Sequence, residues 1–353
     1  MEYKIGLIGC GTVGQGLLET LLKRKEQLRE EFDFEVKVVS ISDKLKGSLL
    51  IPEGINLEML LHLLESGKKI SEYLEGKPNE AEQMDSLEII DKCDADIIAE
   101  LTYTDIKTAE PATSHIKKAL RTGKHVVTSN KGPAALYYRE LKKLAQENNL
   151  FFRIEGTVMS GTPVFNLFEN GLAGNKIKEI KGILNGTTNF ILSKMEEENM
   201  DYEDALKLAQ KLGYAEADPT ADVEGYDALA KIVILSNVLL QGNIKPSDAK
   251  REGISSLGKD EILAAKEEGY RYKLIALTKK ENGQITASVS PQKLPLSDPL
   301  AGIMGANNAL TFDLDLLGKV TIQGPGAGKI ETGYSILIDM LTIHRHFSKK
   351  AEK

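Results

Sequence analysis

Apolar residues in the first part of the chain form short continuous runs that alternate with longer stretches of helical spacing. The runs have the length of buried strands and lie at residues 3–9, 35–42, 96–102, 124–129 and 150–154. Strands that alternate with helices predict a parallel sheet with helices on both faces, and ligands bind such sheets beyond the carboxyl ends of the strands. The pattern therefore predicts an α/β domain.

The segments between these runs differ in character. Helical spacing predicts helices at residues 109–121 and 133–148, and a long first helix after Gly14. Residues 48–92 interrupt the alternation as a charged, helix-rich insertion in which we find no catalytic signal.

A glycine-rich, irregular stretch at residues 155–163 ends this alternation. Helices are expected at residues 201–212 and 332–344, and residues 291–298 are expected to be broken by proline. Further strand-like runs follow at residues 273–278, 284–290, 310–315 and 319–323. They predict that the second part of the chain has a sheet of its own.

The most apolar helix is predicted in the second half of residues 213–240. A helix that is apolar on nearly every side is normally buried, yet Asp227 and Lys231 lie in it one turn apart and share a face. The acids Glu216 and Asp222 precede it. Burying a lysine is costly unless a partner compensates its charge. The pattern indicates an active-site lysine, and the alternative is an ordinary helix ion pair.

A glycine motif follows the first predicted strand directly. Residues 9–14 read GCGTVG and open the first helix, so G-x-G-x-x-G stands in the strand–turn–helix context of a dinucleotide site. The glycines allow a tight turn and a close approach of a pyrophosphate, and the helix N-terminus favours its charge. A structural turn is the alternative. The residues expected to bind the cofactor here are Gly9, Gly11, Thr12, Val13 and Gly14.

Other polar residues fall at the carboxyl ends of the predicted strands. Asp43 ends the second strand, where an acid binds the ribose hydroxyls of NAD, whereas Lys44 and Lys46 are placed to hold the 2′-phosphate of NADP. The choice between NAD and NADP stays open. Thr102 and Lys131 stand at the ends of the next two strands, where a plain turn is the alternative reading.

Composition and charge exclude several classes of protein. The 353 residues suffice for two domains, and the formal net charge of −7 argues against binding to nucleic acid, which needs a basic face. No apolar run reaches the roughly 20 residues of a membrane span. Two cysteines give neither a disulfide framework nor a metal-ligand spacing. We expect a cytoplasmic protein with a small-molecule substrate.

Several segments together resemble the homoserine dehydrogenase family over almost the whole chain. These are GCGTVG at 9–14, HVVTSNKGP at 125–133, residues 155–163, GILNGTTNFIL at 182–192, GYAEADPTADVEGYDALAK at 213–231 and GPGAG at 324–328. The resemblance implies the interconversion of L-homoserine and L-aspartate 4-semialdehyde with NAD or NADP, in the biosynthesis of threonine and methionine.

The family also implies a fold and an assembly. A Rossmann-type dinucleotide-binding domain would comprise residues 1–154 and be completed by residues 324–353. An α+β catalytic and dimerisation domain, residues 155–323, would be inserted before the C-terminal helix, and the protein would be a homodimer. We expect a short form with neither an aspartokinase domain nor a C-terminal regulatory domain.

The resemblance assigns roles residue by residue. Lys231 matches the proton donor to the substrate oxygen, and Lys131 matches a second lysine near cofactor and substrate. Thr102, Gly326 and Gly328 join the cofactor site. The substrate pocket would contain Gly186, Thr187, Tyr214, Glu216, Asp222 and Asp227. A monovalent cation, usually sodium, would be bound by Glu155 with the carbonyls of Val158, Ser160 and Thr162.

This chemistry agrees with general principles. Hydride transfer to an aldehyde leaves negative charge on oxygen, which an ammonium group stabilises and protonates. The competing hypotheses are another Rossmann-fold amino-acid or semialdehyde dehydrogenase and a non-catalytic nucleotide-sensing protein. An acylating dehydrogenase needs a nucleophilic cysteine in the substrate domain, and both Cys10 and Cys93 lie before it. A pure sensor has no reason to keep both lysines beside the acids.

Overall fold

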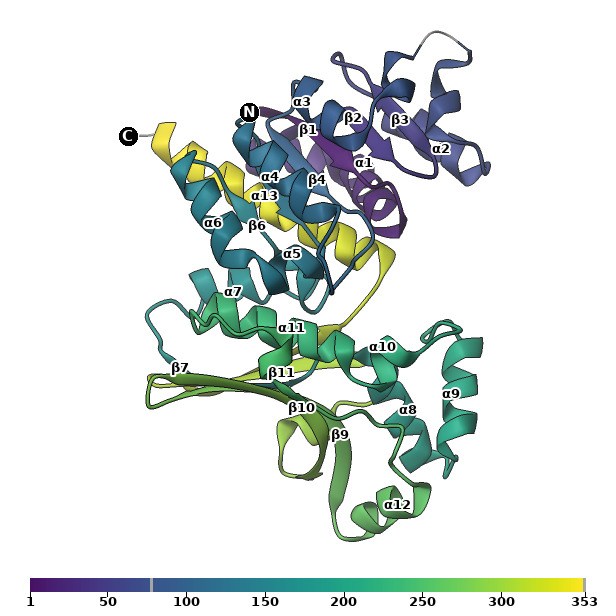
Figure 1. Ribbon diagram of the computed structural model, residues 1–353, viewed down its shortest axis with the longest axis vertical. Coiled ribbons are helices and arrows are strands. Elements are labelled where there is room, and N and C mark those ends of the chain that lie inside the picture. Colours follow the sequence, from purple (N-terminus) through teal and green to yellow (C-terminus); the bar gives the residue numbers. More distant parts are fainter. Residues whose placement is uncertain (77–78, 352–353) are drawn as a thin grey trace. The chain divides into compact units, whose positions relative to one another are not determined.

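The computed structural model describes residues 1–76 and 79–351, which form two compact units. The first comprises Met1–Gly161 and Gly328–Lys353, and the second comprises Thr162–Ala327. Each contains a six-stranded sheet (Figure 1). None of the helices in the described part of the chain is long and apolar enough to cross a bilayer.

The sheet of the first unit has the strand order β3-β2-β1-β4-β5-β6. Neighbouring strands are parallel except β3, which runs antiparallel to β2. The strands are β1 (Glu2–Ile8), β2 (Glu35–Asp43), β3 (Gly47–Leu50), β4 (Ile97–Glu100), β5 (His125–Thr128) and β6 (Phe152–Arg153). The predicted α/β class with a doubly wound first unit is confirmed.

The helices of this unit follow the expected alternation. They are α1 (Thr12–Phe32), α2 (Leu57–Glu65), α3 (Ser86–Lys92), α4 (Ala112–Arg121), α5 (Lys131–Leu136), α6 (Tyr138–Glu147) and α13 (Lys329–Ala351), with 3-10 turns η1 (Ile70–Leu74), η2 (Glu80–Gln83) and η3 (Glu155–Thr157). One prediction was wrong. Residues 133–148 do not form one helix, because the chain breaks at Tyr137. The insertion is helix-rich as predicted, and strand β3 stands at its start.

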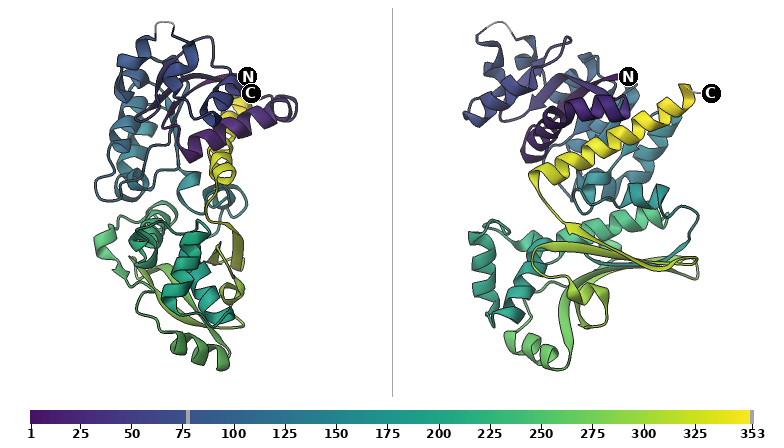
Figure 2. Two further views of the ribbon diagram at one scale, coloured as in Figure 1. Left: turned by 90° about the vertical axis from the view of Figure 1, so that its right-hand side faces the viewer. Right: turned by 180° about the vertical axis from the view of Figure 1, so that it is seen from behind.

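Helices α1 and α13 come from opposite ends of the chain and run beside each other in the first unit (Figure 2). Two glycines permit their close approach. A Cβ atom on Gly16 would lie 1.9 Å from the carbonyl oxygen of Lys329, and one on Gly333 would lie 2.4 Å from the carbonyl carbon of Gly16. A buried ion pair between Arg153 and Asp339, 3.1 Å long, ties α13 to the end of β6.

The second unit has the strand order β12-β11-β7-β9-β10-β8. Its strands are β7 (Ile177–Ile183), β8 (Lys250–Arg251), β9 (Tyr270–Glu281), β10 (Gln284–Pro295), β11 (Asn307–Leu314) and β12 (Gly318–Pro325). Its helices are α7 (Phe165–Asn170), α8 (Gly186–Glu197), α9 (Tyr202–Lys211), α10 (Thr220–Val223), α11 (Tyr226–Leu239) and α12 (Lys259–Glu267), with η4 (Pro246–Asp248) and η5 (Pro299–Gly302).

Two features of this sheet differ from the prediction. Strand β7 was not predicted, because its isoleucines recur every third residue, which resembles a helix; pairing with β11 and β9 makes it a strand. Strand β10 continues through Pro291, which was expected to break it. Strand β8 pairs only with Ser288 and Val289, so from Pro291 onward β10 has a free edge that tolerates proline.

Candidate active site

The glycine motif forms the turn between β1 and α1. Gly9 has φ 99°, and a Cβ atom there would lie 2.5 Å from the carbonyl oxygen of Leu101. A Cβ atom on Gly14 would lie 2.7 Å from the carbonyl oxygen of Gly9, whereas one on Gly11 would meet nothing within 4 Å. Gly9 and Gly14 therefore serve the turn and its packing, and Gly11 leaves open space beside the backbone.

Helix α1 begins at Thr12 and Val13, and its N-terminus suits a phosphate. Its N-cap, Gly11, offers no side-chain hydrogen bond, and the first turn contains no acid. The positive end of the helix dipole is therefore not compensated locally, which favours an anionic ligand. These residues fit the pyrophosphate of a dinucleotide.

Asp43 and Lys46 at the end of β2 are bound to this turn. One oxygen of Asp43 accepts from the Cys10 amide at 2.7 Å, and the other accepts from the amides of Leu45 and Lys46 at 3.0 Å. The Lys46 ammonium donates to the carbonyl of Cys10 at 2.5 Å. Burial raises the pKa of the Cys10 thiol to about 12, so this cysteine is a neutral packing residue. Asp43 thus holds the loop as well as standing at the predicted ribose position.

Thr102 and Lys131 follow β4 and β5, which are adjacent strands. Thr102 donates its hydroxyl to the carboxylate of Glu100. Lys131 is the first residue of α5, and the side chain of Asn130 caps that helix by accepting from the Gly132 amide at 3.2 Å. Sequence reasoning missed Glu100, because a glutamate at the end of an apolar run looks like an ordinary exposed residue.

The acids and the lysine of the apolar helix form a hydrogen-bonded cluster in the second unit. Lys231 is 7% exposed and donates to Asp227 Oδ2 and to the carbonyl of Leu184, both at 2.7 Å. Asn185 donates to Asp227 Oδ2 at 3.0 Å and to Asp222 Oδ1 at 2.6 Å. Asn185 was not predicted as a site residue, although it stands beside Gly186 in a dense run of polar residues.

The other predicted pocket residues lie on α8 and after α9. Thr187 donates its hydroxyl to the carbonyl of Tyr214 at 2.6 Å, and the Tyr214 ring is half exposed and packs on Phe190 at 4.8 Å between centroids. Gly186 begins α8, and a Cβ atom there would lie 2.6 Å from the carbonyl oxygen of Ala306. Glu216 is exposed, and its carboxylate has no partner among the described residues.

The predicted cation ligands belong to both units. Glu155 and Val158 are fully buried in the first unit, where Ser160 has φ 51° and shares a 2.7 Å hydrogen bond with Thr332. Thr162 belongs to the second unit. A carboxylate with carbonyl oxygens is a donor set suited to hard cations. No cluster of three or more His, Cys, Asp or Glu side chains in the described part of the chain is placed to bind a metal.

The last predicted cofactor residues lie at the end of β12 and before α13. A Cβ atom on Gly326 would lie 2.4 Å from the carboxamide of Asn308, whereas Gly328 has φ 147° and sits against the Glu331 carboxylate. Asn308 is fully buried, and neither polar atom of its carboxamide has a hydrogen-bond partner among the described residues. Sequence reasoning did not single out Asn308.

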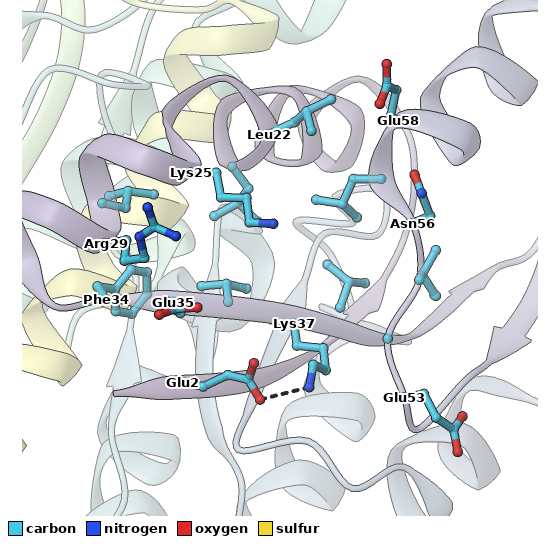
Figure 3. A pocket seen from close by; sticks show the side chains of 17 residues that line it. Glu2, Leu22, Lys25, Arg29, Phe34, Glu35, Lys37, Glu53, Asn56 and Glu58 are labelled. Atoms are coloured by element: carbon cyan, nitrogen blue, oxygen red, sulfur yellow. Dashed lines mark ion pairs between the residues drawn. The ribbon is translucent and has the colours of Figure 1, made fainter.

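A cavity of about 430 Å³ lies beside α1 and does not include any predicted site residue (Figure 3). Lys25 and Arg29 of α1 border it, and Lys37 pairs with Glu2 at 2.9 Å on its other side. Glu2 is the first residue of β1, so the cavity lies toward the start of that strand, whereas the glycine turn follows its end. It is therefore separate from the dinucleotide position.

Two family models together match most of the chain. The family model described as "Homoserine dehydrogenase" matches residues 163–341, and the model described as "Homoserine dehydrogenase, NAD binding domain" matches residues 9–155. A relative from Pseudomonas canavaninivorans, named an NAD(+)-dependent homoserine dehydrogenase, is 44% identical over 352 residues, which cover 99% of each chain. A homoserine dehydrogenase from Methanocaldococcus jannaschii is 40% identical over 97% of this chain and 99% of its own.

Solved structures agree with these matches. A putative homoserine dehydrogenase from Archaeoglobus fulgidus aligns with a TM-score of 0.85 and 38% identity over 97% of this chain and 99% of its own. A hyperthermophilic archaeal homoserine dehydrogenase in complex with NADPH aligns with a TM-score of 0.80 and 33% identity over 97% of both chains.

Proposed function

The chain belongs to the homoserine dehydrogenase family, and from this premise we propose how its residues carry out the NAD(P)-dependent interconversion of L-homoserine and L-aspartate 4-semialdehyde. The bound nicotinamide cofactor supplies or takes up the hydride. The chain must bind the amino acid, orient it, and transfer a proton at the oxygen of the reacting carbon.

Lys231 is proposed as the proton donor during aldehyde reduction and as the group that stabilises charge on the oxygen. A lysine ammonium has three N–H donors. Asp227 and the carbonyl of Leu184 take two of them, and no other residue in the described part of the chain accepts the third. Lys231 is thus a buried donor that two partners hold in place, and one of its N–H groups is left for the substrate oxygen. This observation carries the proposed role.

Lys131 is proposed as the second lysine of the reaction, near cofactor and substrate. It is the first residue of α5, directly after the capping residue Asn130. Because the cap is buried and hydrogen-bonded, the backbone of Lys131 has a defined position.

The substrate's ammonium group is proposed to bind Glu216 and Asp227. Asp227 accepts from Lys231 and Asn185, which hold its carboxylate in place beside the proposed proton donor. The exposed carboxylate of Glu216 is unpaired among the described residues, so a cationic ligand would compensate its charge. Tyr214, Asp222, Gly186 and Thr187 complete the proposed pocket.

The cofactor is proposed to bind the turn at residues 9–14, with Asp43, Thr102, Gly326 and Gly328 as further contacts. Either NAD or NADP agrees with these residues, because Asp43 suits ribose hydroxyls and Lys46 lies beside the same turn. One relative is named for NAD(+), and one solved relative contains NADPH. Initial rates with both cofactors, measured from nicotinamide absorbance, would determine the preference.

Four further proposals concern the domains, the assembly, the location and a bound cation. Residues 1–154 with 324–353 would be the dinucleotide-binding domain, and residues 155–323 the substrate and dimerisation domain of a cytoplasmic homodimer. Light scattering of the purified protein would test the dimer, and cell fractionation would test the location.

Sodium is proposed to bind at Glu155, Val158, Ser160 and Thr162. Equal activity in sodium and choline salts would count against it.

The role of Lys231 is tested by Lys231→Ala in the homoserine oxidation assay. We expect turnover to fall by a factor of about 100 or more, as for the loss of a general acid–base group. Lys194→Ala is the matched control, because Lys194 also pairs with an acid four residues away, Glu198, on a helix of the same unit. Near-normal turnover of Lys231→Ala would contradict the assignment.

A further inference from the structure

Glu100 is a fully buried acid whose role the proposed reaction does not explain. It ends β4 and is 0% exposed. Among residues 1–76 and 79–351, the only basic side chain within ion-pair distance of it is His115 on α4, at 3.3 Å. Burying a carboxylate without lysine or arginine is costly unless several donors surround it. The contacts of Glu100 therefore indicate its role.

Several donors surround one oxygen of Glu100, Oε1. Oε1 accepts from the hydroxyl of Thr102 and from its backbone amide, the latter at 3.4 Å, and His115 Nδ1 lies 3.3 Å away. Oε2 lies 3.4 Å from the hydroxyl of Thr128, which donates at 2.6 Å to the carbonyl of Glu100 itself. A backbone amide can only donate, so Oε1 must act as an acceptor.

The same network fixes the ends of β4 and β5 against each other. Asn130, 1% exposed, donates its amide to the Thr128 hydroxyl at 2.9 Å. Its side chain donates to the carbonyls of Thr102 and Tyr103 at 3.3 and 3.1 Å. Thr102 is therefore held through its hydroxyl, its amide and its carbonyl. Its side chain has little freedom to choose another hydrogen-bond partner.

We propose that Glu100 is a positioning residue that makes the Thr102 hydroxyl a hydrogen-bond acceptor for the bound nicotinamide cofactor. A threonine hydroxyl has one donor and two acceptor sites. Its single hydrogen points at Glu100, so only lone pairs remain for a ligand. Thr102 then recognises an N–H or O–H donor, such as the cofactor's carboxamide or a ribose hydroxyl. The inference rests on the proposed placement of Thr102 in the cofactor site.

The test is Glu100→Leu in the full chain, which keeps a side chain of similar size but removes the acceptor that orients the Thr102 hydroxyl. The hydroxyl hydrogen is then free to turn toward the ligand and meet the ligand's donor. We expect the dissociation constant of NADPH, measured by nicotinamide fluorescence without substrate, to rise about tenfold. Glu100→Gln is the conservative variant: because the Thr102 amide requires an acceptor, the glutamine oxygen takes the position of Oε1, and NADPH should bind as it does to the unsubstituted protein.

Thr102→Val removes the acceptor itself and should cause a similar loss, and it keeps the test valid if Glu100→Leu does not fold. Thr113→Val is the matched control, because among the described residues its buried hydroxyl on α4 bonds only to the carbonyl of Ala109. It should bind NADPH like the unsubstituted protein. Titrating an analogue in which an acetyl group replaces the cofactor's carboxamide separates the two donors. If the loss of affinity in Glu100→Leu disappears with this analogue, the carboxamide is the partner; if the loss persists, a ribose hydroxyl is.

The outcomes separate this inference from the proposed site. Normal NADPH affinity of Thr102→Val would remove Thr102 from the cofactor site, and the inference with it. Impaired NADPH binding by Thr102→Val together with normal binding by Glu100→Leu would overturn the role of Glu100 alone. Both results are independent of homoserine oxidation, because binding is measured without substrate.

Discussion

Lys273 provides a sharp test of how burial acts on a charge in this protein. It lies on β9, is 1% exposed, and its ammonium donates to Asn189 Oδ1 at 2.9 Å and to the carbonyl of Ile303. Burial is the main cause that lowers the pKa of Lys273 from 10.5 to about 8, although Glu196 opposes the shift. The folded protein therefore releases this proton more readily than the unfolded chain does.

The sign and the size of the effect follow from linkage. Between pH 8 and 10.5 the unfolded state binds more protons at this lysine, so the free energy of unfolding rises with pH in that window. The difference between about 8 and 10.5, at 1.36 kcal/mol per pH unit, corresponds to about 3 kcal/mol. About 2 kcal/mol of it should appear between pH 7.5 and 9.5.

Chemical unfolding at a series of pH values measures this contribution when variants are compared. Lys273→Met never carries the charge, and Lys273→Arg keeps it throughout, so neither should show the rise. Subtracting the free energy of unfolding of either variant from that of the unsubstituted protein removes the contribution of the other titrating groups. A difference that stays constant from pH 7.5 to 9.5 would refute the reasoning, because Lys273 would then have the same pKa folded and unfolded.

Two further predictions concern the first unit. Burial lowers the pKa of His125 to about 4, so the folded state resists protonation of this side chain. The free energy of unfolding should therefore fall by up to about 2 kcal/mol from pH 7 to 5. His125→Gln should lose that part of the acid sensitivity. Gly16→Ala should reduce the free energy of unfolding by at least about 2 kcal/mol, because its Cβ would meet the backbone of Lys329 at 1.9 Å. Gly302→Ala, where a Cβ meets nothing within 4 Å, is the control, and equal melting temperatures of the two variants would contradict the packing argument.

Much of the fold could be predicted from the sequence because its signals are local. The glycine turn after β1 and the alternation of strands and helices depend on neighbouring residues, and both were predicted. The errors arose where distant segments decide the outcome. Strand β7 has the apolar spacing of a helix and becomes a strand by pairing with β9 and β11, more than 80 positions away along the chain.

The candidate site shows the same difference between contacts of neighbouring residues and contacts of distant segments. Asp227 and Lys231 are one helical turn apart, so helix geometry alone brings them together, and the sequence by itself determined that pair. Only the tertiary structure placed Asn185 between Asp222 and Asp227, 37 and 42 positions away, and Glu100 beside Thr128, 28 positions away. Periodicity and propensity describe a residue's surroundings over a few turns. The partners of a buried polar group come from whichever segments the packing brings to it, so tertiary structure alone decides them.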